Sequence, residues 1–354
     1  MRKITRLHLP LLALFLATAV VIFSCSKDEE DEILNVPQGK ISGKVYSKSG
    51  KPMAGIRVFI SEYPQFHTMS VKDGSFTLSA PEGKHTLVLQ GGKGNIFQTI
   101  LSVNVKSNQS ITLTQSQTVL TQIGNLAYIK GAYDRIETII IDSLGYTATE
   151  LFITDLDSLS KLQPFQAIFL NCGKSGMLDS LKYANLENFV TGCGSIYASD
   201  WAVEYLTGDG NFKGQIHREH GSGAAIPKTP GNCVPKIGGF IPDSSLCTSK
   251  SGSSGIIDSI DIVYPALQVL LGKTKMSIHY DLGIWEVINL LNPNYITLLQ
   301  DNTATNYGPL AVWIQYNTTC TKGGNIVYTT FHNEPYGGTS PDVMQILQFF
   351  IVNM

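Results

Sequence analysis

The stretch Asn185-Leu-Glu-Asn-Phe-Val-Thr-Gly-Cys-Gly-Ser-Ile-Tyr197 decides the fold, because it carries a helix into a strand. A helix is predicted from about Leu178 to Thr191, and a compact apolar strand follows at Ser195 to Ala198. Helices and strands that alternate along a chain are typical of a parallel sheet covered on both faces. This stretch therefore predicts an α/β unit.

The same alternation extends over the second half of the chain. Strands are predicted at 124–129, 147–153, 167–170, 276–281, 295–299, 310–316 and 325–331, and helices at 133–144, 157–162, 258–271 and 341–352. Right-handed crossovers between such elements give a flavodoxin-like, doubly wound sheet. Residues from about 207 to 255 are rich in Gly, Ser, Pro and Lys, which predicts an insertion over one rim.

The segment from residue 39 to about 116 has a different pattern. Lys40–Tyr46 alternates apolar and polar residues, and Lys72-Asp-Gly74 is a hairpin signal. Short strands at this spacing predict a small β-sandwich. The predicted fold class is therefore multi-domain, with a small all-β sandwich at 39–116 followed by a flavodoxin-like α/β doubly wound parallel sheet at 122–354.

The chain begins with a basic segment, an apolar run from Leu7 to Phe23 and then Cys25. These are the parts of an export signal, and the run is short for a stable membrane span. We predict a signal peptide at 1–24 and an acidic tether at 25–38. An ordinary signal peptide with an incidental cysteine is the alternative.

Phe23-Ser24-Cys25 resembles the end of a bacterial lipobox, and the acidic residues that follow resemble the surface-export signal of Bacteroidetes lipoproteins. The resemblance implies lipidation of Cys25. It also implies that the protein is anchored to the bacterial outer membrane by that lipid, with its folded part exposed at the surface.

Charge and cysteine usage limit the remaining partners. The 354-residue chain has a net charge of −2, which gives no electrostatic case for binding nucleic acid.

Five cysteines follow Cys25, and an odd number leaves at least one unpaired within the chain. Cys233 and Cys247 share one irregular stretch and are the predicted disulfide pair. His217 and His220 are isolated and favour a solvated loop, so neither a metal nor a cofactor is predicted.

The β segment resembles the carboxypeptidase regulatory-like domain, a transthyretin-like sandwich. The matching parts are Ile41–Val45, Gly50–Val58, Asp73–Phe76 and Pro81–Leu87. Members of this family mostly act as spacers or binding modules. Nucleophiles, acids and bases are not concentrated in this segment, so we assign it no chemistry.

Three polar motifs follow strands of the predicted α/β unit, and they should converge at the carboxyl ends of those strands. They are Asn171-Cys-Gly173, Ser199-Asp200-Trp201 and His332-Asn-Glu334. The candidate catalytic residues are His332, Glu334, Ser199 and Asp200, and the candidate binding residues are Asn171, Cys172 and Trp201.

Residues 122–352 resemble the class I glutamine amidotransferase-like superfamily. Asn185–Tyr197 looks like the stretch that enters the nucleophile elbow of this family, and Thr330-Phe-His-Asn-Glu334 looks like its strand-end His-x-Glu. In active members the elbow holds a cysteine whose proton passes to the histidine. Here Ala198–Ala202 occupies the elbow without a cysteine, so glutamine hydrolysis is not predicted. The pattern is closer to the cysteine-free branch that includes trehalose-utilisation-like proteins, which implies fold more than activity.

Each candidate residue has an alternative structural role. Ser199 and Asp200 are also suited to capping the helix that follows them, and His332 and Glu334 to holding the strand end. For Cys172 the favoured interpretation is a buried apolar residue, and for Trp201 it is a core residue rather than a platform for a sugar.

Two functions remain open. The first is a non-enzymatic surface lipoprotein that binds a small molecule, glycan or protein at the strand-end cleft. The second is an extracytoplasmic hydrolase of glycan or amide bonds, in which His332 is the base, Glu334 orients it, and Ser199 or Asp200 reacts. The second requires His332 within hydrogen-bond reach of Ser199 or Asp200, or one water away.

Overall fold

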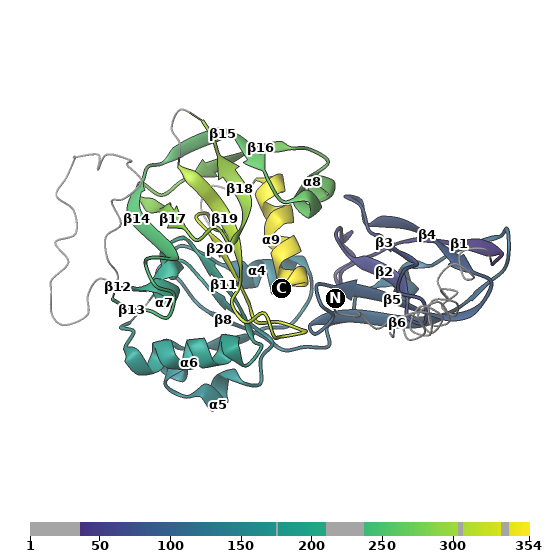
Figure 1. Ribbon diagram of the computed structural model, residues 1–354, viewed down its shortest axis with the longest axis horizontal. Coiled ribbons are helices and arrows are strands. Elements are labelled where there is room, and N and C mark those ends of the chain that lie inside the picture. The colour runs from purple at the N-terminus through teal and green to yellow at the C-terminus, as the bar shows by residue number, and fades with distance from the viewer. Residues whose placement is uncertain (1–35, 175, 210–236, 304–306, 334–339) are drawn as a thin grey trace, which may run out of the picture.

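The computed structural model describes residues 36–174, 176–209, 237–303, 307–333 and 340–354 (Figure 1). Several predicted features lie outside the described residues, namely the signal peptide with Cys25, Glu334, Cys233, His217 and His220. Within the described ranges, no helix is long and apolar enough to cross a membrane.

A mixed sheet of nine strands forms the centre of the larger unit, in the order β16-β15-β18-β19-β20-β11-β10-β8-β9. Five strands pair in parallel, namely β9 (Thr149–Leu151), β8 (Leu126–Ile129), β10 (Ala167–Leu170), β11 (Ser195–Ser199) and β20 (Asn325–Thr329). Four strands extend this sheet in antiparallel fashion, namely β19 (Gly308–Gln315), β18 (Ile296–Asp301), β15 (Gly255–Ile262) and β16 (Lys275–Tyr280). The α/β class is therefore confirmed, but a wholly parallel sheet is wrong.

Both faces of this sheet are buried, which explains why its central strands are continuous apolar runs. On β11, Ile196 contributes to the hydrophobic cluster on one face and Tyr197 to the cluster on the other. The first face is covered by η2 (Ile153–Asp157), α5 (Leu159–Leu162), α6 (Ser180–Thr191) and α7 (Glu204–Thr207). The second face is covered by α4 (Ile136–Thr138), the π-helical turn η1 (Ile139–Ser143), α8 (Pro265–Leu271) and α9 (Pro341–Asn353).

Local sequence explains where the two longest of the described helices begin. The Asp179 side chain accepts the Lys182 N–H at 3.0 Å at the start of α6, and the Ser340 hydroxyl accepts the Val343 N–H at 3.3 Å at the start of α9. Between α6 and β11, a Cβ on Gly194 would collide with the Phe189 ring. Glycine at this position therefore lets the helix pack directly against the strand that follows it.

The N-terminal unit contains two small sheets. One has the order β4 (Ser75–Pro81), β1 (Gln38–Lys44), β7 (Ser110–Thr112), and the other has the order β3 (His67–Met69), β2 (Arg57–Ile60), β5 (Gly83–Gly91), β6 (Phe97–Val105). Ile41 of the first and Leu89 of the second belong to one hydrophobic cluster. The short helix α3 (Gln115–Thr118) leads towards β8.

The N-terminal unit packs beside the C-terminal end of α9 (Figure 1). The Gly92 N–H donates to Asn353 Oδ1 at 3.0 Å, and a Cβ on Gly92 would lie 2.6 Å from the Asn353 carbonyl oxygen. Residues of both units also share one hydrophobic cluster. The two units are therefore in direct apolar contact.

The predicted helix at 258–271 is wrong in its first half, because β15 runs to Ile262 and only Pro265–Leu271 is helical. A register shift between Ile257 and Ile260, with Ser259 at φ +61°, spaces the buried isoleucines by three residues. The bulge thus gives the apolar residues of this strand a spacing that resembles the period of a helix. The predicted helix at 133–144 shortens to α4 and η1.

Parts of the predicted insertion at 207–255 are ordered strands. β12 (Gly208–Asp209) pairs with β13 (Ile237–Gly238), and β14 (Leu246–Gly252) pairs with β17 (Trp285–Leu291). β17 was not predicted. It brings Glu286 to the end of β11, where η3 (Asp200–Val203) begins.

A disulfide joins Cys193, after α6, to Cys320, after β19, with a Cα–Cα distance of 5.6 Å. Their separation of 127 residues explains why no sequence spacing indicated the pair. Cys247 is also disulfide-bonded, and Cys172 is a buried free thiol.

Removing the long-range disulfide should destabilise the fold. We expect Cys193→Ala/Cys320→Ala to lower the free energy of unfolding by about 2–5 kcal/mol, because closure of a long loop restricts the unfolded chain. Urea unfolding without reductant measures this loss. Cys172→Ser is the matched control, since it changes a buried cysteine but no disulfide. Equal unfolding midpoints for the double variant and the wild type would contradict the expectation.

Candidate functional site

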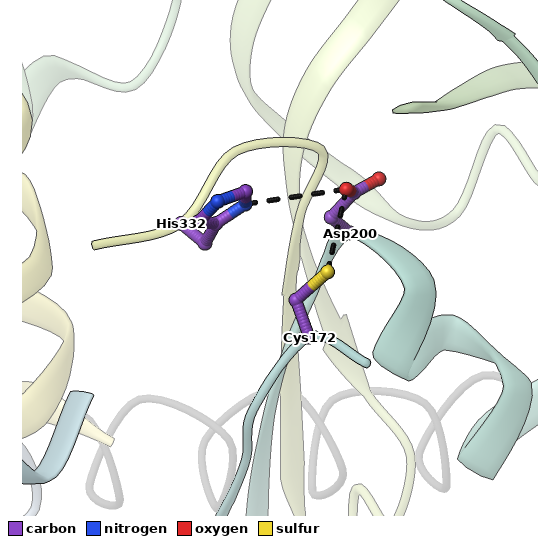
Figure 2. A group of neighbouring side chains, drawn as sticks. All are labelled: Cys172, Asp200 and His332. Atoms are coloured by element: carbon purple, nitrogen blue, oxygen red, sulfur yellow. Dashed lines mark hydrogen bonds and ion pairs between the residues drawn. The ribbon is translucent and has the colours of Figure 1, made fainter. Parts of the chain in front are cut away.

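The three predicted polar motifs meet at the carboxyl ends of three adjacent parallel strands. Cys172 lies just after β10, Asp200 directly after β11, and His332 just after β20. One ligand-type atom of each residue lies within 4.8 Å of the other two (Figure 2). We call Cys172, Asp200 and His332 the strand-end triad.

Asp200 occupies the sharp turn from β11 into η3. Its φ of +45° is in the left-handed region, which non-glycine residues rarely adopt and which clusters at functional sites. Its side chain is fully buried, and Oδ1 accepts the Glu286 N–H at 2.7 Å. The Cys172 thiol donates to Oδ2 at 3.5 Å. Asp200 thus occupies a strained turn between a strand and a helix without being exposed.

Ser199 is part of a buried network that fastens the strand ends together. Its hydroxyl donates to Asp134 Oδ2 at 2.5 Å and accepts the Cys172 N–H at 3.1 Å. Asp134 Oδ1 in turn accepts the Asn333 N–H at 3.1 Å. The capping interpretation is wrong for Ser199, because its side chain makes no cap hydrogen bond to η3. Asp134 was not among the predicted site residues, and Asn333 lies inside a predicted motif but was assigned no role.

Asn171 and Trp201 lie beside the triad rather than in it. Asn171 accepts the Ile136 N–H at 3.3 Å and donates to Glu137 Oε2 at 2.8 Å, which fixes the start of α4. Trp201 is half-buried, and Lys250 Nζ lies 4.5 Å from its ring centroid. This cation–π contact places Trp201 at the rim of the site.

The His332 ring is buried, with 6% of its side chain exposed. Nδ1 lies 4.0 Å from Asp200 Oδ2, and Nε2 lies 3.9 Å from Asp281 Oδ1. Neither nitrogen has a hydrogen-bond partner among the described residues. Asp281 directly follows β16 and was not among the predicted site residues.

Burial disfavours the charged form of each residue of the triad. Desolvation raises the pKa of the Cys172 thiol and of the Asp200 carboxyl well above their usual values. It also lowers the pKa of His332 to about 4. The shifts therefore favour the thiol over the thiolate and the neutral imidazole over its charged form, and they move the Asp200 carboxyl towards its protonated form. That combination disfavours a thiolate nucleophile and leaves three different donor atoms facing one another.

No family model matches this chain, and no curated protein matches it. Similar solved structures include a GMP synthase-like protein from Thermoplasma acidophilum, at 11% identity over 65% of this chain and 94% of that one, with a TM-score of 0.38. A ThuA-like protein from Bacteroides uniformis matches at 11% identity over 64% and 89%, also with a TM-score of 0.38. The N-terminal domain of mmIFT52 matches at 7% identity over 65% and 98%, with a TM-score of 0.41. TM-scores this low decide nothing about activity.

The buried Asp134 should make stability depend on pH. Desolvation raises its pKa to about 7, so between about pH 4 and 7 the folded chain keeps a proton that the unfolded chain has released. Its stabilising contribution is complete below pH 4 and is lost as pH rises to 7. Asp134→Asn remains uncharged, so it should gain stability over the wild type by up to about 4 kcal/mol from pH 4 to 8.

Urea unfolding of both proteins at pH 5 and pH 8 measures this difference. The exposed carboxyl of Asp142 provides the control variant Asp142→Asn. A difference between wild type and Asp134→Asn that does not change with pH would show that Asp134 does not titrate in this range.

Proposed function

We propose that this protein is an exported lipoprotein, anchored to the bacterial outer membrane through Cys25, whose α/β unit is of the glutamine amidotransferase-like kind and binds a ligand at the strand-end triad without hydrolysing glutamine. One observation carries the second part. A buried Asp200, held by the Glu286 N–H, fills the elbow position where a hydrolase of that family has its cysteine.

The proposed fold rests on strand order. The parallel strands lie in the order β9-β8-β10-β11-β20, so the second strand along the chain lies outside the first, followed by the third, fourth and fifth. A flavodoxin-like doubly wound sheet has this order, and its ligands bind at the carboxyl ends. The triad lies at those ends, which supports a binding role for it.

Cys172 lies near the elbow but is poorly placed to replace the missing nucleophile. Cys172 follows β10 rather than β11, and its thiol is buried and donates to Asp200. The raised pKa of that thiol further opposes formation of the attacking thiolate. Glutamine hydrolysis through this cysteine is therefore disfavoured by position, access and protonation together.

The order of the parts supports an exported role. In the proposed arrangement the lipid on Cys25 and the acidic tether precede the two small β sheets, which resemble a carboxypeptidase regulatory-like spacer. The α/β unit then lies furthest along the chain from the membrane. A small molecule, a glycan or a protein outside the cytoplasm is the ligand in this proposal.

A hydrolase is the second candidate, and one arrangement favours it. Asp200 at its strained elbow, His332 and Asp281 form a line resembling a nucleophile, a base and an orienting acid. Asp281 would then take the role first expected of Glu334. Burial opposes this candidate, because the Asp200 carboxyl is inaccessible and desolvation raises its pKa, which disfavours the carboxylate form that would attack.

Lipidation gives the first test of the proposal. In a bacterial host fed a clickable fatty acid, we expect the wild type to incorporate label and sediment with membranes. Cys25→Ala should lose both properties, because it removes the acylated thiol. Cys172→Ser should keep them as the matched control. A labelled, membrane-bound Cys25→Ala protein would contradict the proposed anchor.

Covalent probes separate the two candidate functions. We expect iodoacetamide to label Cys172 at least about 100-fold more slowly in the folded chain than in urea, since reaction requires opening of the core. A fluorophosphonate should not label Ser199, and an epoxide should not label Asp200. Labelling of either residue in the folded wild type, abolished in His332→Ala, would replace the binding proposal with the hydrolase.

A further inference from the structure

The strand-end triad presents three different ligand atoms to one point. Cys172 Sγ lies 3.5 Å from Asp200 Oδ2, and Asp200 Oδ2 lies 4.0 Å from His332 Nδ1. Figure 2 shows the thiol and the imidazole approaching the same carboxylate oxygen. The three side chains come from the ends of neighbouring strands, so the sheet itself fixes their spacing.

The unsatisfied imidazole of His332 is the observation that indicates a bound ligand. Only 6% of its side chain is exposed, and both ring nitrogens lack a hydrogen-bond partner among the described residues. Buried polar groups in proteins are nearly always satisfied, and an orphan calls for an explanation such as an ion. Nδ1 is the nitrogen nearer to Asp200, and Nε2 is the one nearer to Asp281. An ion beside Asp200 would satisfy Nδ1.

The spacing of the triad fits a tetrahedral metal. With Zn–S near 2.3 Å and Zn–N and Zn–O near 2.1 Å, tetrahedral ligands lie roughly 3.4–3.6 Å apart. The sulfur–oxygen distance of 3.5 Å already has this value, and the oxygen–nitrogen distance of 4.0 Å needs a shift of roughly half an ångström. All three ligand atoms lie within 4.8 Å of one another, so a movement of the imidazole ring by roughly an ångström closes the site.

Ligand chemistry selects the class of metal. Thiolate and imidazole favour zinc and related transition metals, whereas calcium and magnesium prefer oxygen ligands alone. One thiolate and one carboxylate also balance the two positive charges of the ion. The buried site would then carry no net charge, which removes the main cost of placing ions there.

The surroundings contain the supporting contacts that such a site needs. Metal-bound histidines usually donate their second N–H to a carboxylate, and Asp281 Oδ1 lies 3.9 Å from Nε2. The Glu286 N–H holds Asp200 Oδ1 and leaves Oδ2 directed at the triad. The Glu286 contact orients Asp200, and Asp281 lies where a small movement of the His332 ring would let it accept the Nε2–H.

We infer that Cys172, Asp200 and His332 bind one transition-metal ion of the Zn²⁺ class through Sγ, Oδ2 and Nδ1, leaving the fourth position to water or to an atom of the bound ligand. Binding releases the thiol proton to solvent as the metal–sulfur bond forms, and the Asp200 carboxyl binds as its carboxylate. The inference rests on the proposed binding function and identifies the group through which the site holds its ligand.

Metal content tests the inference. The full chain is stripped with EDTA, dialysed against Zn²⁺ alone and analysed by inductively coupled plasma mass spectrometry. We expect one zinc per wild-type chain and less than one tenth of that in His332→Ala and Asp200→Asn. Asp281→Asn should bind roughly 10–100-fold more weakly, because it loses only the orienting carboxylate.

The absorption spectrum of bound Co²⁺ reports the metal–sulfur bond directly. It would show no thiolate-to-cobalt band if Cys172 had only a structural role. The wild type loaded with Co²⁺ should show a thiolate-to-cobalt charge-transfer band in the near ultraviolet, and Cys172→Ser should lack it. Zn²⁺ should raise the thermal unfolding midpoint of the wild type but not of His332→Ala. That comparison separates loss of the site from loss of the fold, because each variant is compared with its own metal-free form.

Two histidine variants serve as controls. His279→Ala removes an exposed histidine from β16, and His217→Ala/His220→Ala removes the pair in the 210–236 segment. Both should retain one zinc and the cobalt band. A metal-free wild type, or zinc lost only in His217→Ala/His220→Ala, would overturn the inference. The proposed binding function would survive that result, since it fails instead when the covalent probes label Ser199 or Asp200 in a His332-dependent way.

Discussion

The Ser199 hydroxyl is the contact on which the rest of the site depends. It accepts the Cys172 N–H from the end of β10 and donates to Asp134, which lies between β8 and α4. Asp134 then accepts the Asn333 N–H beyond β20. One buried hydroxyl at the end of β11 thereby joins four parallel strand ends. Because this network is buried, each of its bonds is costly to leave unmade, so the strand ends stay in register.

That network also explains how the triad acquires its geometry. Fastening Ser199 fixes the residue before Asp200, and the Glu286 N–H fixes the carboxyl after the turn. Asp200 is held from both sides in a backbone conformation that a free chain would avoid. Antiparallel strands are therefore part of the site, since Asp281 directly follows β16 of the large sheet and Glu286 lies in β17, which pairs with β14 in a separate two-stranded sheet.

The elements with strong local signals were predictable. The β10, β11 and β20 runs, the helix α6 and the convergence of their polar ends follow from apolar patterning and the rules of parallel sheets. Other features depend on contacts that are distant in sequence. β17 has no clear period, the bulge at Ser259 imitates a helix, and Cys320 lies 127 residues from Cys193. Asp134 and Asp281 also escaped notice, because nothing local distinguishes them from solvent-exposed aspartates.

The elbow residue itself gives the strongest reason to regard this site as functional. At a strand-to-helix turn with positive φ, the backbone conformation costs least energy for glycine and next least for asparagine. The chain instead places a fully buried aspartic acid there, which adds a desolvation cost to the backbone strain. A thiol and an orphan imidazole face the same carboxyl oxygen. Backbone strain, a desolvated carboxyl and an unsatisfied imidazole therefore coincide at one point. A bound cation stabilises the ionised carboxyl and also occupies the imidazole nitrogen. It thus offsets both the desolvation of Asp200 and the missing hydrogen bond of His332.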